Sequence, residues 1–158
     1  MKSKVHFSNY CKAVTLTVII ALGMVIYQSH LHTGSSVLAT VIFFIVLLSG
    51  LFYCPRTLEA TDKELIIHRA LWKNKVLPYA EIKSAESCLP SAGGLRLCGS
   101  GGFMGYWGYF HDTLIGAYFG YYANYKECFL IQMNSGKQYV LSCREHKEML
   151  RFLQNQIR

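Results

Sequence analysis

The first third of the chain contains two long apolar runs without a charged side chain. Residues 13–27 read AVTLTVIIALGMVIY, and residues 37–53 read VLATVIFFIVLLSGLFY. A helix needs roughly 17–25 such residues to cross a bilayer. The first run falls short of that range, but Lys12 and Gln28 at its ends can reach the interface. The pattern predicts a membrane anchor in residues 1–54, with transmembrane helices at about 13–28 and 37–53.

A cleaved signal peptide is the alternative for the first run, because Lys2, Lys4 and Lys12 supply a basic start. However, residues 26–30 make a poor small-residue cleavage pattern. A second apolar run also follows where a mature secreted domain should begin. We therefore favour the two-helix anchor.

Charges beside the apolar runs predict the orientation of this anchor. The connector at residues 29–36, SHLHTGSS, has no Lys or Arg, whereas three lysines precede the first run and Arg56 follows the second. Positive residues stay on the cytoplasmic side of a membrane. We expect a protein of the cell inner membrane that crosses the lipid bilayer through residues 13–53 and has both termini in the cytoplasm.

After Pro55 the pattern changes to short alternating segments, which predict β-strands. Residues 61–64 and 134–137 have turn chemistry between such segments, and NSGK at 134–137 is the cleanest hairpin signal in the chain. The end of the chain is predicted to be helical. Ser142 and Glu145 fit a capping box. The apolar residues behind them share one helix face: Met149, Leu150, Leu153 and Ile157.

Charge and cysteine usage narrow the classes of function. The net charge of +7 divides into +3 from the first twelve residues and +4 from residues 55–158, which carry thirteen basic and nine acidic side chains. This mild excess suits a domain beside anionic lipid, and no basic run indicates nucleic acid. The six cysteines form no CxxC pair, and His30 and His32 are too few for a zinc site. We expect free thiols, no metal and no cofactor.

Catalysis has little support in the sequence. The carboxylates are dispersed along the chain, and the cysteines and serines lack a nucleophile elbow. His111 and Asp112 are adjacent, but neighbours on an extended chain point to opposite faces. They are better explained as turn residues. We therefore expect no catalytic residues and no enzyme.

The most unusual segment is GSGGFMGYWGYF at residues 99–110, with five glycines and five aromatic residues. We call it the Gly–aromatic segment. It is no phosphate-binding loop, because no lysine follows its glycines until Lys126. Cross-strand aromatic packing is the favoured interpretation, and a ligand platform is the alternative. A third possibility combines them, with Trp107 touching lipid headgroups. The binding hypothesis names Phe103, Tyr106, Trp107 and Tyr109.

A second candidate surface is a loose basic rim near the predicted strand turns. Its members are Lys63, Arg69, Lys73 and Lys75. Lys73 and Lys75 are the candidates for contact with anionic headgroups.

Three segments carry a resemblance to a known family. They are Leu77-Pro78-Tyr79 with Ile82, the Gly–aromatic segment, and Tyr139-Val140-Leu141-Ser142 before the terminal helix. Because of these three segments, residues 55–158 resemble the bacterial pleckstrin-homology-like (PH-like) domains of small membrane proteins. The resemblance implies a mainly β, α+β cytoplasmic domain with a bent antiparallel sheet of about seven strands capped by a C-terminal helix. Cys143 and Arg144 depart from the residues expected to open that helix.

The resemblance implies binding and no common catalytic site. We expect a membrane-tethered binding or scaffold module that contacts a protein partner at the inner face of the membrane. The alternative is a sensor for anionic lipid or a small anion that uses the basic rim at Lys73 and Lys75.

Overall fold

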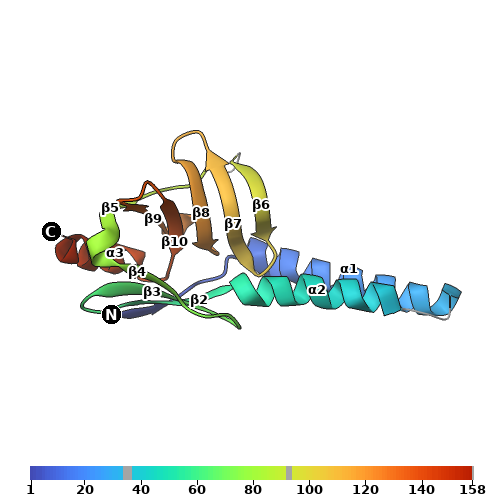
Figure 1. The fold of residues 1–158 in the computed structure, drawn as a ribbon. Helices are drawn as coiled ribbons and strands as arrows, with labels where there is room; N and C mark the ends of the chain where they lie inside the picture. The colour runs from blue at the N-terminus through green and yellow to red at the C-terminus, as the bar shows by residue number, and fades with distance from the viewer. Residues whose placement is uncertain (34–36, 92–93, 158) are drawn as a thin grey trace.

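Two long helices form a stalk that projects from a β-domain (Figure 1). The structure, a computed structural model, describes residues 1–33, 37–91 and 94–157. Helix α1 covers Asn9–Thr33 and helix α2 covers Val37–Tyr53. By length and composition α1 can cross a membrane, and 6% of its apolar window is buried within the protein. Helix α2 is a shorter apolar helix.

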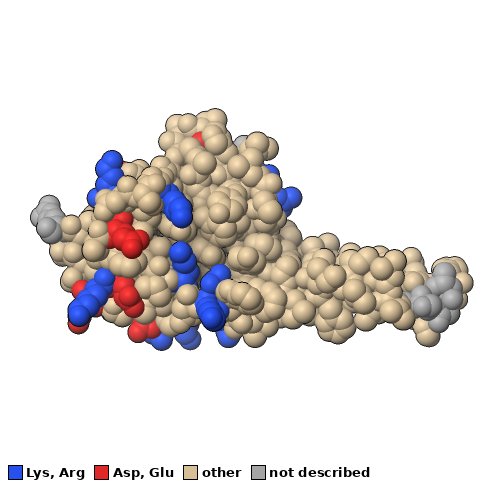
Figure 2. Space-filling view, viewed as in Figure 1, with Lys and Arg blue, Asp and Glu red and all other residues tan. Residues whose placement is uncertain are grey.

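The stalk presents apolar side chains to its surroundings. Leu31, Val37 and Leu38 are among its exposed residues, and the visible face of the stalk in Figure 2 shows no Lys, Arg, Asp or Glu. Exposed apolar area costs about 25 cal/mol per Å² in water. The stalk therefore requires a lipid or protein environment. Helix α2 has the bounds expected for the second apolar run, whereas α1 extends beyond residues 13–28 at both ends.

A four-stranded antiparallel sheet with the order β1-β2-β3-β4 lies beside the base of the stalk. Its strands are β1 (Lys2–Lys4), β2 (Pro55–Ala60), β3 (Glu64–Arg69) and β4 (Lys75–Pro78). Strand β1 was not predicted, because three polar residues carry no hydrophobic pattern. It pairs with β2 in the register Lys2↔Glu59 and Lys4↔Thr57, so the N-terminus joins the β-domain.

A second sheet has six strands in the order β5-β9-β10-β8-β7-β6. Its strands are β5 (Ile82–Ser87), β6 (Leu95–Gly102), β7 (Gly105–Asp112), β8 (Gly116–Tyr122), β9 (Cys128–Met133) and β10 (Gln138–Ser142). Strands β8 and β10 are parallel, and the other neighbours are antiparallel. The turn expected at residues 134–137 joins β9 to β10.

The main core lies between the two sheets and is covered at one end by helix α3 (His146–Gln156). Met149 and Leu153 of this helix are fully buried, as the apolar spacing predicted. The predicted capping box is wrong. Ser142 is buried at the end of β10, where its Oγ accepts a hydrogen bond from the backbone N–H of Ala123 at 3.0 Å. The helix begins later, with Glu145 as an N-cap that makes no side-chain capping bond.

The predicted mainly β, α+β fold with a C-terminal helix is confirmed. Within the described part of residues 55–157 it has nine strands in two sheets, where we expected about seven strands in one. The sheets separate where β4 ends at Pro78, which has no N–H to continue the ladder. The 3₁₀ turn Tyr79–Glu81 then carries the chain from the first sheet to the second.

Candidate functional site

The Gly–aromatic segment forms most of the β6–β7 hairpin, whose turn contains Phe103 and Met104. Gly99 and Gly108 lie directly opposite each other in the two strands. Both have positive φ, and a Cβ at Gly108 would overlap the carbonyl oxygen of Cys98. These two glycines therefore let the strands approach more closely than any side chain permits.

The tip of this hairpin is packed against the base of the stalk. The backbone N–H of Met104 donates to Thr15 Oγ1 in α1 at 2.9 Å. On the other side, a Cβ at Gly50 of α2 would lie 2.5 Å from the ring of Phe103. The hairpin tip therefore holds both helices, which fixes how the stalk leaves the β-domain.

The aromatic residues of β7 divide between two faces of the sheet, as alternation along a strand requires. Tyr106 and Phe110 are buried on one face. On the other face, Trp107 stacks on Tyr53, the last residue of α2, at 5.0 Å between ring centroids. Tyr109, also on that face, is 58% exposed. The four predicted binding residues do not form one platform, and their role in binding stays a prediction.

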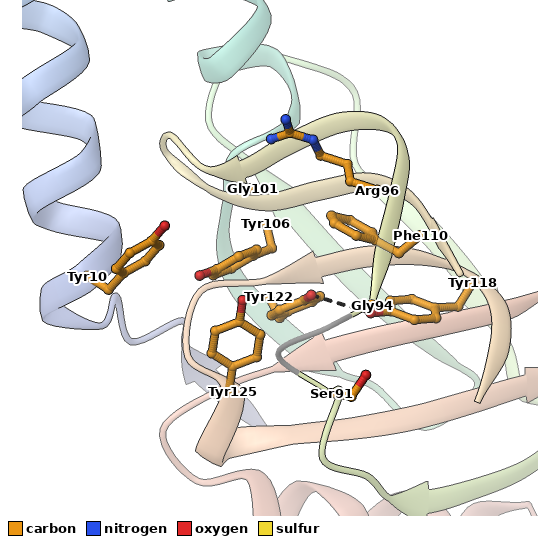
Figure 3. A pocket seen from close by; sticks show the side chains of 10 residues that line it. All are labelled: Tyr10, Ser91, Gly94, Arg96, Gly101, Tyr106, Phe110, Tyr118, Tyr122 and Tyr125. Carbon is orange, nitrogen blue, oxygen red and sulfur yellow. Dashed lines mark hydrogen bonds between the residues drawn. The ribbon is translucent and has the colours of Figure 1, made fainter. Parts of the chain in front are cut away.

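A tyrosine-lined cavity of about 470 Å³ opens beside the buried face of β7 (Figure 3). We call it the tyrosine cavity. The rings of Tyr106 and Tyr122 stack with centroids 4.8 Å apart, and Phe110 stacks on Tyr118 at 5.6 Å. The residues that line the cavity are Tyr10, Ser91, Gly94, Arg96, Gly101, Tyr106, Phe110, Tyr118, Tyr122 and Tyr125. Of the predicted binding residues, only Tyr106 is in this lining.

Three buried hydroxyl groups of this cavity, those of Tyr106, Tyr118 and Tyr122, are neutral at physiological pH. Burial raises the pKa of Tyr118 to about 12. Burial also raises the pKa of Tyr122 and of Tyr106 well above the ordinary tyrosine value, and hydrogen bonding to a neighbouring tyrosine adds to each shift. Arg96 is the one charged residue in the described lining. The cavity offers hydrogen bonds and aromatic surface, without an activated nucleophile.

His111 and Asp112 are the last two residues of strand β7, where they pair with Ala117 and Gly116 of β8, so the prediction that they are turn residues is wrong. His111 is exposed, whereas Asp112 is 1% exposed and lies on the opposite face of β7. Asp112 accepts hydrogen bonds from the N–H and hydroxyl of Ser91 and from the N–H of Leu114. Burial opposes ionisation of this carboxyl, but these bonds together lower its pKa. The carboxylate thereby organises two loops.

Of the predicted rim, Lys73 lies in the β3–β4 connection and Lys75 is the first residue of β4. The Nζ of Lys75 lies 5.7 Å from the centroid of the Tyr139 ring. The carbonyl oxygen of Lys73 accepts a hydrogen bond from Arg69 Nε at 2.8 Å. Contact of these lysines with anionic lipid stays a prediction.

A second cavity, of about 520 Å³, has basic residues in its lining that the sequence analysis did not bring together. We call it the cationic cavity. Its lining residues are Lys2, Lys4, Val5, Phe7, Cys54, Arg56, Thr57, His68 and Arg69. A signal was present in the K-S-K spacing at residues 2–4, since alternation on a strand points both lysines to one face. Recognising it required knowing that this short segment is a strand.

Among the described residues, no three His, Cys, Asp or Glu side chains are grouped to hold a metal ion, and all six cysteines are free thiols.

Comparison with known proteins gives one finding about ancestry. A family model for the bacterial PH domain matches residues 56–157, while no curated protein and no solved structure matches the chain. The matched region covers most of the chain and contains the two-sheet core with its terminal helix. The chain therefore belongs to the bacterial PH domain family.

Proposed function

We propose that this protein is a membrane-tethered binding module that engages a protein partner close to the inner face of the cell inner membrane. PH domains are typically non-catalytic binding modules, and the described cavities present no activated nucleophile or acid–base pair. The apolar surface of the stalk supports the tether. The lysines before α1 and Arg56 after α2 support an orientation with both termini in the cytoplasm.

We propose that both helices of the stalk cross the bilayer. The 17 residues of α2 span about 26 Å at 1.5 Å per residue, against a hydrocarbon core of about 30 Å. A mismatch of this size is accommodated by local thinning of the bilayer. The stacked pair of Tyr53 and Trp107 at the end of α2 supports an interface at this level, because aromatic rings favour the headgroup region.

The observation that carries the protein-binding proposal is the open edge of the second sheet. Strand β6 ends the strand order, and no described strand pairs with its outer side. Leu95 and Leu97 on this edge are 63% and 59% exposed. An edge with unpaired backbone groups and exposed apolar side chains is a template for strand addition. We infer that β6 accepts an extended segment of a partner that carries alternating apolar residues.

Photocrosslinking from the edge strand tests this proposal in intact cells. A photoreactive residue at Leu97 of the full chain should capture one defined protein, and Leu95→Lys should abolish the capture because a charge blocks strand pairing. The control position is Leu114, which is 86% exposed but lies in the β7–β8 turn. Equal capture from Leu114, or capture unaffected by Leu95→Lys, contradicts a role for the edge. Trp107 is a poorer position, because its ring stacks on Tyr53.

A further inference from the structure

The cationic cavity is assembled from three strands of the first sheet. Strand β1 contributes Lys2 and Lys4, β2 contributes Arg56, and β3 contributes His68 and Arg69. The register places Lys4 opposite Thr57, and Thr57 opposite His68, in one row across the sheet. Leu58 and Ile67, their neighbours along the strands, are buried in the core on the other face. The basic side chains therefore gather on the outer face.

The positive charge of this cavity is incompletely neutralised by the described residues. Glu59 Oε2 lies 3.1 Å from Lys2 Nζ and 2.8 Å from His68 Nε2. The hydrogen bond from His68 lowers the pKa of Glu59, and the hydrogen bond from Lys2 adds a smaller lowering. No carboxylate in the described part of the chain forms an ion pair with Lys4, Arg56 or Arg69.

Like charges held together without counter-charges repel one another, and an anion relieves that repulsion. Lysine and arginine side chains form their strongest hydrogen bonds with phosphate and carboxylate oxygens. The guanidinium of Arg69 is already oriented by the carbonyl oxygen of Lys73 and lies 6.0 Å from the ring centroid of Tyr53. One of the cations is thus held in place at the end of α2.

An apolar groove of about 570 Å³ adjoins the cationic cavity at the base of the stalk. Phe7, Cys54 and Arg56 line both spaces, so the two are adjacent. The other residues of the groove come from both helices, the β3–β4 connection and the hairpin tip: Lys12, Thr15, Leu16, Ile19, Leu51, Ala70, Leu71 and Met104. Figure 2 shows basic side chains near the place where the β-domain meets the stalk, whose visible face has no charged side chain.

We propose that the cationic cavity and the adjoining groove bind one anionic phospholipid, with its phosphate group against Lys4, Arg56 and Arg69 and an acyl chain between the bases of α1 and α2. The adjacency of the two spaces argues for a lipid over free phosphate, because a soluble anion would leave the apolar groove uncovered. This assignment rests on the membrane placement in the proposed function. It adds a defined lipid site at residues outside the Lys73 and Lys75 rim.

A bound lipid differs from general attraction to an anionic surface, because attraction depends on net charge and a site depends on position. The test therefore uses two double variants of the full chain with the same change in charge. Lys4→Gln with Arg56→Gln removes two cations from the cavity. Lys63→Gln with Lys126→Gln removes two cations outside its lining.

Native mass spectrometry of the detergent-solubilised full chain provides the readout. With phosphatidylglycerol added, the unmodified chain and the Lys63/Lys126 variant should retain one lipid, and phosphatidylcholine should bind weakly. The affinity of the Lys4/Arg56 variant for the lipid should fall at least about tenfold, because two charge-assisted contacts are removed. The variant with Lys4→Arg and Arg56→Lys, which keeps both positive charges, should retain part of the binding. Near-ultraviolet circular dichroism shows whether each variant is folded.

Three results would overturn the lipid site: equal loss of lipid in both double variants, no preference for the anionic lipid, or displacement of the lipid by millimolar inorganic phosphate. The last result would identify the site as one for free phosphate. Extraction of the full chain from membranes by alkaline carbonate would contradict the membrane tether itself. Retention in the membrane without lipid preference would contradict only the lipid site, so the two failures are distinguishable.

Discussion

The two cavities are similar in volume, about 470 and 520 Å³, but opposite in chemistry and in origin. The tyrosine cavity is mostly built from residues 91–125, and it buries neutral hydroxyls among stacked rings. The cationic cavity joins residues 2–7 to residues 54–69 and gathers basic side chains on an outer face. The conspicuous Gly–aromatic segment supplies part of the first, whereas the pairing of a three-residue strand contributes to the second. The comparison shows that a conspicuous segment and a charged site can lie on separate parts of one domain.

The largest effect is expected from Gly108→Ala, which should disrupt the tyrosine cavity and leave the cationic cavity intact. The new Cβ would overlap the Cys98 carbonyl oxygen, at a positive φ that alanine adopts poorly. We expect a loss of more than about 3 kcal/mol in the free energy of unfolding. Thermal unfolding of the detergent-solubilised chain measures it.

The matched control for this substitution is Gly116→Ala. Gly116 also has positive φ, but nothing lies within 4 Å of its added Cβ. It should cost about 1 kcal/mol from backbone conformation alone. Equal losses at Gly108 and Gly116 would contradict the close approach of β6 and β7.

Ser3→Pro should act on the other cavity by removing a backbone donor from the middle of β1. Ser3 Oγ also accepts a hydrogen bond from the N–H of Glu145 at 3.3 Å, which the variant loses. We expect a loss of about 2 kcal/mol and faster hydrogen exchange along β2. The near-ultraviolet circular dichroism of the tyrosines should stay unchanged.

Ser3→Ala separates the two contributions, because it keeps the N–H and removes only the hydroxyl. It should lose about 1 kcal/mol with little change in exchange along β2. If the amide hydrogens of β2 exchange no faster in Ser3→Pro than in Ser3→Ala, β1 does not stabilise the edge of the first sheet.

A last effect, which is absent at neutral pH, is expected at alkaline pH on the tyrosine side of the comparison. Burial raises the pKa of Tyr118 from 10 to about 12 in the folded chain. A raised folded pKa stabilises the fold below the unfolded value, and this contribution is lost as pH rises from about 10 to 12. Absorbance titration should show ionisation of Tyr118 delayed relative to the chain unfolded in denaturant. The Tyr118→Phe variant should remove part of that delay, and an unchanged titration curve would contradict its burial.

Much of the fold could be predicted because it depends on local pattern. The apolar spacing of Met149 and Leu153 predicted the face of α3 that is buried, and residues 134–137 predicted the β9–β10 turn. The predicted start of the helix was wrong because Ser142 accepts a hydrogen bond from the buried N–H of Ala123, just after β8, and does not cap the helix. A local motif cannot show which distant donor competes for its hydroxyl.

The candidate site could be predicted only in part. The Gly–aromatic segment forms most of the β6–β7 hairpin, and the alternation of β7 divides its aromatic residues between a buried cavity and the end of α2. Lys73 and Lys75 were chosen because they lie beside the predicted strand turns. Lys4 and Arg56 were missed because proximity in a sheet depends on strand register and not on sequence separation.

The sequence by itself determined the apolar stalk, the mainly β family domain and its C-terminal helix, because hydrophobic periodicity and turn chemistry are local properties. Tertiary structure alone decided that the N-terminal residues Lys2–Lys4 extend the first sheet and that the tip of the β6–β7 hairpin contacts both helices. It also decided that basic residues scattered along the sequence line one cavity. Pairing between distant strands is set by the burial of Leu58 and Ile67 on the opposite face. The charged surface is therefore a consequence of how the core is packed.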